Sequence, residues 1–379
     1  MQNFGAVSGT RSNVLEEGFW WEYLWGTIVL VLCTGICLAG SSIFARASNG
    51  LLVILLVATF SIPVSALFMK PFTIPHLGVE FTGVRLQTLL ENLKPQFTKH
   101  AAGSQLKGRE NFQDLFGILF PATGGIFAGA SMSGDLKNPS KAIPKGTLAG
   151  LALTFVTYAL VVIAMAASIT RKSFYKNVNI IQEANLSGMV ILLGEFATSF
   201  FSALMGVIGS AKLLQALSRD SLLPGLGIFG KGGKKSDEPI FAIIVTFLVA
   251  QLTMLFDINQ IASFVTMAYL MTFLVTNLAC FLLKIGSAPN FRPSFHYFSW
   301  KTAVAGTLVS GASMIFVDGL YAAGCVGILV LLFLLIHYTS PPKPWGDVSQ
   351  SLIYHQVRKY LLRLKQEHVK FWRPQILLF

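Results

Sequence analysis

Residues 114–135 read DLFGILFPATGGIFAGASMSGD, an apolar run interrupted in its middle by Pro121 and by the pair Gly124 and Gly125. A proline removes one backbone donor and neighbouring glycines loosen the helix further, so the run predicts a membrane helix broken into two halves. Each half is too short to cross a bilayer alone. Irregular backbone at membrane depth needs cover from protein or a water-filled cavity, and in transporters it builds ion sites. The alternative is a glycine-rich packing face, or a proline kink, that binds no ligand.

The composition of the whole chain is that of a polytopic membrane protein. Hydrophobic residues make up 53% of the 379 residues and charged residues 12%. These values exclude an ordinary soluble enzyme, a secreted disulfide scaffold and a disordered chain. The net charge of +12 comes from short loops and the C-terminal tail, so no nucleic acid is expected as a partner. The four cysteines lie in apolar runs, where neither disulfides nor zinc ligation is expected.

No enzyme is expected, because the motifs of catalysis and cofactor binding fail. The segment 231–236, KGGKKS, lacks the first glycine of a phosphate-binding loop. The six histidines are scattered without metal-binding spacing. We therefore expect no cofactor, and no metal beyond the transported ions.

Apolar runs of membrane-spanning character, the broken one included, predict nine spans. They cover 24–44, 49–69, 115–132, 146–168, 188–209, 240–256, 261–283, 302–317 and 319–336. Lysine and arginine are concentrated in the loops on the tail side of these spans, which predicts a cytoplasmic C-terminus. Because nine is odd, the segment before the first span is expected on the opposite side.

The runs predict an extracytoplasmic segment, a transmembrane transporter domain and the start of a cytosolic domain, at 1–23, 24–338 and 339–379. A long extracytoplasmic loop is expected at 70–113 and the broken helix at 114–136. An amphipathic helix at 348–364 is expected along the cytoplasmic leaflet, against a partner domain or as a solvated linker. No signal peptide precedes the first span, and nothing covers the apolar end at 375–379. We therefore expect a fragment, truncated at both ends.

The broken helix predicts ion sites of both signs. Carbonyls freed around Pro121 and Thr123 can coordinate a cation. The amides that open the second half-helix, at Gly125, Ile126 and Phe127, can bind an anion. A cation and an anion are then expected side by side.

Other polar groups inside the spans have both a functional and a structural interpretation. Glu195 is a carboxylate well inside a span, where both a functional role and solvation near the helix end remain open. On the same helix, the hydroxyls of Thr198 and Ser202 can bind a cation, although bonding to the carbonyl four residues earlier is commoner. Tyr269 and Phe273 lie one helical turn apart, and packing is the expected role of both.

The run 120–147, FPATGGIFAGASMSGDLKNPSKAIPKGT, resembles the sixth transmembrane helix and first cytoplasmic loop of the cation-chloride cotransporter family. Further agreement comes from 209–220, GSAKLLQALSRD, and from 288–293, APNFRP. The tail at 346–360, GDVSQSLIYHQVRKY, is most similar to the fungal vacuolar branch of the potassium-chloride type. The resemblance covers nearly the whole chain.

This resemblance implies a LeuT-like fold of the amino acid-polyamine-organocation type, an all-α membrane protein built on two inverted five-helix repeats. The nine spans then correspond to helices 4–12 of the family. The first three helices and most of the cytosolic domain are missing from such an alignment. The resemblance also implies a homodimer of the full-length protein and an inactive fragment when this chain is alone.

The resemblance also assigns residues on the broken helix to ions. It implies that Pro121 and a threonine hold potassium and that the amides of 125–127 hold one chloride. In the family, that threonine directly precedes the glycine that opens the second half-helix. Here Thr123 stands one position earlier, and Gly124 takes its place.

Two further regions are assigned in the same way. A family tyrosine near the second chloride aligns with Phe273, which has no hydroxyl, and Tyr269 one turn away is the substitute. In sodium-coupled members a serine pair stands where this chain has Phe201 and Ser202, near Thr198. The loss of one hydroxyl there predicts a lost sodium site.

The leading prediction is sodium-independent symport of potassium and chloride, by alternating access about the broken helix. The alternatives are an amino-acid or polyamine permease of the same fold, and a non-transporting regulatory partner of a cation-chloride cotransporter. The expected partners are potassium, chloride and membrane lipid. The expected location is the vacuolar membrane, with the plasma membrane as the alternative.

Overall fold

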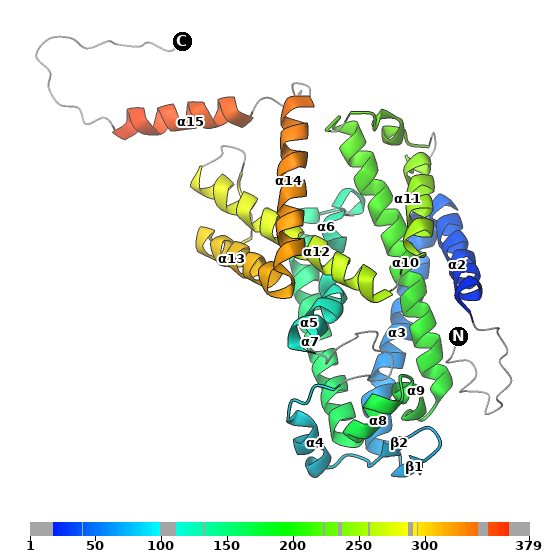
Figure 1. The fold of residues 1–379 in the computed structure, drawn as a ribbon. Coiled ribbons are helices and arrows are strands. Elements are labelled where there is room, and N and C mark those ends of the chain that lie inside the picture. Colours follow the sequence, from blue (N-terminus) through cyan, green and yellow to red (C-terminus); the bar gives the residue numbers. More distant parts are fainter. Residues whose placement is uncertain are drawn as a thin grey trace, which may run out of the picture. The chain divides into compact units, whose positions relative to one another are not determined.

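The computed structural model describes residues 18–39, 41–98, 111–131, 133–222, 224–233, 237–256, 258–286, 291–293, 295–339 and 348–363. Within these residues the chain is helical apart from one short hairpin and the connecting loops (Figure 1). The elements in chain order are α2 (Phe19–Ala39), α3 (Ser41–Phe68), β1 (Phe72–Ile74), β2 (Val79–Phe81), α4 (Leu86–Leu93), α5 (Phe112–Leu119), η1 (Phe120–Phe127), α6 (Ala128–Ser131), η2 (Ser133–Asp135), α7 (Pro139–Ser168), α8 (Arg171–Lys176), α9 (Ile180–Glu183), α10 (Gly188–Arg219), η3 (Gly227–Gly230), α11 (Ile240–Thr253), α12 (Ile258–Ile285), α13 (Trp300–Val317), α14 (Gly319–Thr339) and α15 (Val348–Arg363).

Seven of the described helices are long and apolar enough to cross a membrane. They are α2, α7, α10, α13 and α14, together with the Asn49–Phe68 part of α3 and the Ile261–Ile285 part of α12. The other two predicted spans are the interrupted run α5–η1–α6 and the 14-residue apolar helix α11. The prediction of an all-α polytopic membrane protein is confirmed.

The first helix boundary differs from the sequence prediction. The expected span 24–44 is replaced by α2, which begins at Phe19 and ends at Ala39, and α3 begins at Ser41. Glu22 is the charged residue that separates the aromatic residues 19–21 from the apolar run expected at 24–44. Aromatic residues belong to a membrane helix where it meets the headgroups. Residues 1–17 of the expected first segment, and 340–347 and 364–379 of the expected tail, lie outside the described residues.

The chain divides into two compact units, which are described separately here. The first contains Met1–Tyr269 and Phe316–Ser340, and the second contains Leu270–Ile315 and Pro341–Phe379. The boundaries between the units fall inside α12 and α13.

The core of the first unit lies where α2, α10 and α11 pack together (Figure 1). Two cysteines of α2 point at α10, where the Cys33 thiol lies 3.7 Å from the Phe200 carbonyl and the Cys37 thiol 3.8 Å from that of Leu204. The two cysteines are four residues apart on α2, and the two carbonyls are four residues apart on α10. The two contacts therefore repeat once per helical turn along both helices. All four cysteines are free thiols.

Helix α3 packs on the other part of α10 at a very short distance. A Cβ atom built on Gly194 of α10 would lie 2.2 Å from the Cβ of Ala58 on α3. Only glycine allows this approach, because real Cβ atoms do not come so close. This contact holds α3 and α10 together within the first unit.

A cap made of β1, β2, α4, α8 and α9 lies at one end of the first unit (Figure 1), and its hairpin was not predicted from the sequence. Strands β1 and β2 pair antiparallel, with Phe72 opposite Phe81, and the turn between them uses Gly78 at φ +66°. Within the cap, Arg171 of α8 donates to the carbonyl of Glu91 in α4, and to the Lys94 carbonyl and Gln96 Oε1 in the loop after it. The three-residue strands are too short for an alternating pattern to reveal them.

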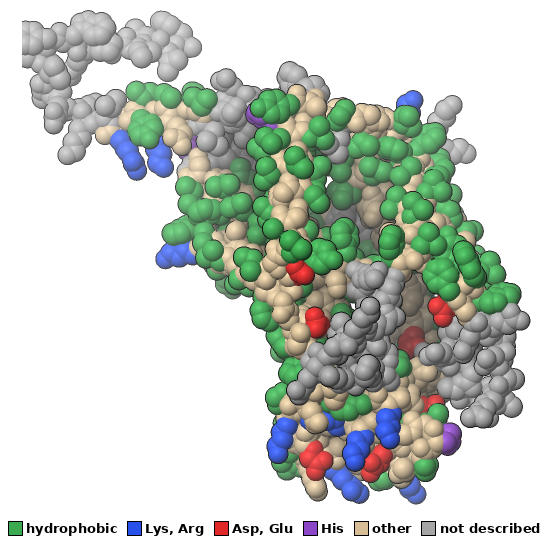
Figure 2. Space-filling model, viewed as in Figure 1, with side chains coloured by type: hydrophobic (Ala, Val, Ile, Leu, Met, Phe, Trp, Pro, Cys, Tyr) green, Lys and Arg blue, Asp and Glu red, His purple; other side chains and the backbone are tan. Residues whose placement is uncertain are grey.

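The surface of the first unit fits a protein that meets both lipid and water. Figure 2 shows hydrophobic side chains over the faces of its long helices, and charged side chains gathered near the end that carries β1, β2, α4 and α8. Exposed apolar residues of this kind are, for example, Phe155 and Val162 of α7 and Leu193 of α10. Large exposed apolar faces are favourable in a bilayer, whereas charged groups are costly there.

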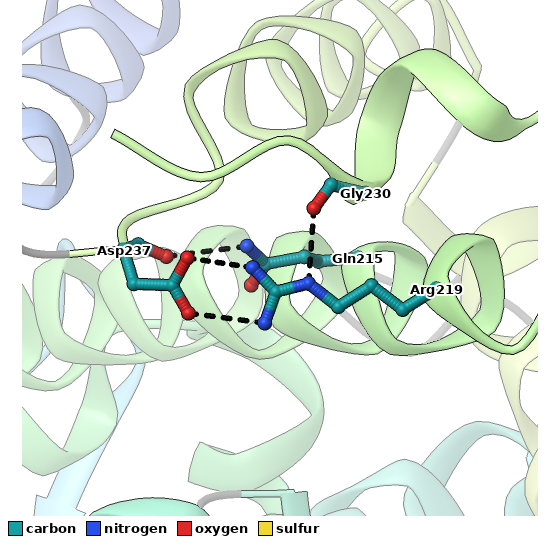
Figure 3. A network of polar contacts seen from close by, with 4 residues as sticks. All are labelled: Gln215, Arg219, Gly230 and Asp237. Atoms are coloured by element: carbon teal, nitrogen blue, oxygen red, sulfur yellow. Dashed lines mark hydrogen bonds and ion pairs between the residues drawn. The ribbon is translucent and has the colours of Figure 1, made fainter. Parts of the chain in front are cut away.

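An ion pair fixes the loop that follows α10. Arg219, at the end of α10, donates to both carboxylate oxygens of Asp237 at 3.0 and 2.6 Å, and to the Gly230 carbonyl at 2.9 Å (Figure 3). Gln215 adds a bond to the Asp237 carbonyl at 3.2 Å. The hydrogen bonds from Arg219 lower the pKa of Asp237, because they stabilise its charged form. Gly230 and Asp237 are thus held against the last two turns of α10.

The second unit contains the C-terminal part of α12, most of α13, and α15. Asn277 of α12 donates to the Phe273 carbonyl at 2.8 Å. Its amide lies so close to Gly306 of α13 that a Cβ there would be 2.6 Å from Asn277 Oδ1. Helix α15 exposes apolar Ile353 and Leu361, and no acidic residue lies in its sequence.

Candidate functional site

The predicted break lies in the first unit, where α-helix gives way to a 3-10 helix. Asn111 caps the start of α5, where its side chain accepts from the Asp114 amide, and at the other end the amide of the capping residue Phe120 donates to the Phe116 carbonyl. The next helical donor would be residue 121, but Pro121 has no N–H. The backbone continues as η1 over Phe120–Phe127 and returns to α-helix only at α6. The interruption therefore begins at the proline.

The 3-10 geometry determines what an anion would need in order to bind at the amides of 125–127. The amides of 125–127 were expected at the start of the second half-helix, but they lie inside η1. In a 3-10 helix each amide donates to the carbonyl three residues earlier, with poorer geometry than in an α-helix. An anion at these amides therefore requires the 3-10 turn to open.

The two adjacent glycines of the break have opposite surroundings. Gly124 is buried, and a Cβ on it would lie 2.4 to 2.7 Å from ring atoms and the hydroxyl of Tyr269 on α12. A Cβ on Gly125 would meet no atom within 4 Å. Gly124 is therefore needed for the close contact with Tyr269, whereas Gly125 faces open space.

Gly125 opens into a groove between η1 and α7. The groove has a volume of about 630 Å³, and Thr123 and Ile126 of η1 also line it. From α7 it receives mostly small or hydroxyl-bearing residues, among them Gly146, Gly150, Thr147, Thr154 and Tyr158. The side of the break that carries the predicted chloride amides is thus accessible from this groove.

The hydroxyl of Thr123 is already engaged. It donates to the carbonyl of Phe120 at 2.8 Å, which is a local bond within the first turn of η1. Its oxygen keeps lone pairs that can still face a cation. Pro121 is half-buried on the same turn.

Nothing in the described residues offers a carboxylate or histidine cage in place of these carbonyls. No group of three or more His, Cys, Asp or Glu side chains there could hold a metal ion. A cation at the break would have to be held by backbone carbonyls and hydroxyls, the ligand type used at unwound membrane helices.

The residues predicted for a lost sodium site lie on α10 and line or adjoin a separate groove. Glu195 and Thr198 line a groove of about 290 Å³ against Ala58 and Thr59 of α3. The Thr198 hydroxyl donates to the Gly194 carbonyl at 2.7 Å, the structural role that sequence reasoning considered commoner. Phe201 is half-buried and Ser202 exposed.

The two residues predicted near a second chloride are separated by the unit boundary. Tyr269 belongs to the first unit and packs on Gly124 of the break. Phe273 belongs to the second unit, where its carbonyl accepts from Asn277. The structure therefore brings Tyr269, the predicted substitute, to the broken helix. In the sequence, the one indication of a role for Tyr269 was that it lies one helical turn from Phe273.

The match to known proteins covers nearly the whole chain. The model of a family described as "Amino acid permease" matches residues 12–378. The chain is 53% identical over 375 residues to a "Vacuolar cation-chloride cotransporter 1" of Saccharomyces cerevisiae, covering 99% of this chain and 33% of that protein. It is 48% identical over 377 residues to an uncharacterized transporter of Schizosaccharomyces pombe, covering 99% of this chain and 36% of that protein.

A vertebrate relative extends the comparison. "Solute carrier family 12 member 9" of Danio rerio is 36% identical over 392 residues, covering 100% of this chain and 43% of that protein. The chain thus spans between a third and a half of the length of these curated relatives. The resemblance to cation-chloride cotransporters, including the fungal vacuolar type, is confirmed. These relatives are named as a cotransporter, a transporter and a solute carrier, which agrees with the expectation of a transporter in place of an enzyme.

Proposed function

This chain belongs to the amino acid permease family, and on that premise we propose that it forms part of a sodium-independent potassium-chloride symporter. The observation that carries the proposal is the break itself, a proline-started 3-10 turn whose Gly125 faces an open groove. The similarity to a vacuolar cation-chloride cotransporter supports the choice of ions. Because the chain spans a third of that relative, we propose the activity for a longer protein that contains it, acting as a homodimer.

The potassium ion is proposed to bind at the start of the break. The carbonyls of Pro121 and Gly124 and the oxygen of Thr123 are the ligands that this turn supplies. Backbone carbonyls replace the hydration shell of potassium in other membrane proteins, and they need no charged side chain. This agrees with the lack of a carboxylate cage among the described residues.

The chloride ion is proposed to bind at the amides of 125–127 when the 3-10 turn opens. A 3-10 turn is a short element with strained hydrogen bonds, so exchanging those bonds for bonds to an anion costs less than in an α-helix. Each ion then screens the charge of the other near the middle of the membrane, where an isolated charge is costly. Tyr269 is proposed to take the place of Phe273 near a second chloride.

Sodium independence is proposed from α10. Phe201 stands where a hydroxyl is expected in sodium-coupled members, so this position supplies no oxygen ligand. Thr198 and Ser202 are both exposed on the same helix, and their oxygens keep lone pairs. The hydroxyl missing at 201 leaves the shell of oxygen ligands that hard cations prefer incomplete.

We place the protein in the vacuolar membrane with its C-terminus in the cytoplasm. The basic residues on the tail side of the spans support this orientation. The vacuolar location follows the printed name of the yeast relative.

The test is chloride-dependent uptake of rubidium, as a potassium tracer, into vacuolar vesicles that carry the full-length protein, with and without sodium. Wild type is compared with Gly125→Leu, which fills open space, and with Gly35→Leu, a matched change in α2 that also meets no atom within 4 Å. We expect uptake that needs chloride, ignores sodium, persists in Gly35→Leu and is lost in Gly125→Leu. Folded wild-type protein without chloride-dependent uptake would refute the symport proposal.

A second candidate is an amino-acid or polyamine permease. The groove of about 630 Å³ at Gly125 is large enough for a small organic substrate, and the matching family model carries the description of an amino acid permease. Uptake of labelled amino acids or polyamines, blocked by Gly125→Leu, would support this candidate. If neither ions nor organic substrates move, co-purification with a related cotransporter would favour a regulatory partner.

A further inference from the structure

The broken helix contains one carbonyl that loses its helical donor by covalent structure alone. In an unbroken helix the carbonyl of Gly117 would accept from the amide of residue 121. Residue 121 is proline and has no N–H. Gly117 is buried, and an unpaired buried carbonyl is costly. A donor from another element is therefore needed at this position.

Thr266 of α12 supplies that donor. Its side chain is fully buried, with 0% exposure, and its hydroxyl donates to the Gly117 carbonyl oxygen at 2.5 Å. Other threonines of the spans behave differently. Thr34, Thr59 and Thr157 each donate to the carbonyl four residues earlier in their own helix. The hydroxyl of Thr266 reaches instead across 149 residues of sequence.

One turn further along α12, Tyr269 contacts the other end of the break. Its ring lies against Gly124, as described above. Residues three apart on a helix share a face, so Thr266 and Tyr269 present one continuous surface to the broken helix. This surface holds the segment from Gly117 to Gly124 at both ends, within the first unit.

Helix α5 is also held from a second side. The Gln113 side chain donates to the Val317 carbonyl at 2.8 Å. A Cβ on Gly117 would lie 3.3 Å from a methyl group of Val317, so the Val317 side chain packs against α5 at Gly117. With α5 tied on both sides, the remaining freedom of the run lies in η1, after the proline.

We propose that Thr266 is a positioning residue, which replaces the hydrogen bond that Pro121 cannot make and thereby sets the geometry of the ion-binding turn. It touches neither ion in this scheme. Without the Thr266 hydroxyl, the Gly117 carbonyl loses this partner. The end of α5 can then shift, and the hydrogen bonds of the 3-10 turn can rearrange. The transport part of this inference rests on the function proposed above, whereas the hydrogen-bond part does not.

The first experiment tests the bond in the purified full-length protein, by the midpoint of thermal unfolding in detergent. Thr266→Val keeps the shape and removes the hydroxyl, and Thr266→Ser keeps the hydroxyl. We expect Thr266→Val to lower the midpoint by roughly 2–4 °C and Thr266→Ser to lower it by less than half as much. Thr34→Val on α2 is the matched control, because its hydroxyl bonds only to Leu30 in its own helix.

A double-mutant cycle then links Thr266 to the proline. Pro121→Ala restores an N–H that can donate to the Gly117 carbonyl, so Thr266→Val should cost less than half as much in that background. An equal loss in both backgrounds would overturn the proposal, since the threonine would then act by packing alone. Thr266→Ser as harmful as Thr266→Val would overturn it as well.

The second experiment measures transport by the same variants, corrected for the amount of folded protein. If the turn is misplaced, the rubidium and chloride concentrations for half-maximal uptake should rise about fivefold in Thr266→Val and return toward wild type in Thr266→Ser. A reduced maximal rate with unchanged half-maximal concentrations would refute the positioning role. If wild type shows no chloride-dependent uptake, the proposed function fails, and the thermal cycle still decides whether Thr266 replaces the missing bond.

Discussion

Gly124 and Gly125 are neighbouring glycines with opposite surroundings, so the same substitution at each position is predicted to have different effects on stability. Gly124→Ala places a methyl carbon 2.4 Å from Tyr269 Cε2 and 2.5 Å from Cζ. Ordinary contact between carbon atoms is about 3.5–4.0 Å, so the ring or the turn has to move by roughly 1 Å. Gly125→Ala places the same methyl group where no atom lies within 4 Å.

The expected magnitudes differ accordingly. Adding a methyl group to a packed contact without space costs about 1–3 kcal/mol. Adding it in open space on a turn changes the free energy of unfolding by about 0.5 kcal/mol or less in either direction. We therefore expect Gly124→Ala to be clearly destabilised and Gly125→Ala to resemble wild type.

The assay is thermal unfolding of the full-length protein in detergent, with wild type, both alanine variants and the pair Gly124→Ala/Tyr269→Ala. Removal of the ring opens the space that the methyl group needs, so the double variant should lose less stability than the two single losses added together. The close approach of α12 to the break would be refuted if Gly125→Ala were as destabilising as Gly124→Ala. Strict additivity in the double variant would refute it too.

Two further predictions concern other parts of the first unit. Gly194→Ala should destabilise the protein by about 1–3 kcal/mol, because its Cβ would lie 2.2 Å from that of Ala58. Gly206→Ala on the same helix meets no atom within 4 Å and should be neutral, so equal thermal midpoints for the two variants would contradict the α3–α10 contact. In the cap, burial raises the pKa of Glu183 above its usual 4.5, with the charge of His76 opposing the shift. The folded cap then binds the proton more tightly than the unfolded chain, so stability should rise as pH falls through this raised pKa toward 4.5. Glu183→Gln should remove that pH dependence of the thermal midpoint, and an unchanged slope would show that another group causes it.

The α-helix is interrupted near the position that Pro121 indicates, with α5 ending at Leu119. Pro121 lacks an N–H whatever surrounds it, but α3 and α7 continue past Pro63 and Pro144, so a proline by itself does not end a membrane helix. The type of backbone that follows was not predictable in the same way. A run of Thr123, Gly124 and Gly125 allows an unwound chain as readily as a 3-10 turn, and the packing of Tyr269 on Gly124 is part of what distinguishes the two.

Boundaries and small elements were harder to predict than long apolar runs. Helix α2 starts at Phe19 because Trp20 and Glu22 still continue the helix, although they break the apolar pattern. The hairpin of β1 and β2 has only three residues in each strand. So short a strand carries no reliable alternation, and it forms because Val79 and Phe81 are buried against Ile169 and Ile180.

The sequence by itself determined that this chain is a polytopic membrane protein of known family, with an apolar run interrupted by Pro121, Gly124 and Gly125. Those properties follow from composition, from apolar runs of bilayer length and from a missing backbone donor, all of which are local. Only the tertiary structure decided that Thr266 meets Gly117, that Tyr269 covers Gly124, and that Gly125 remains open. These contacts join residues more than a hundred positions apart. They depend on how α12 packs against the break, because a hydroxyl or an aromatic ring acquires its role from the atoms that the fold places beside it.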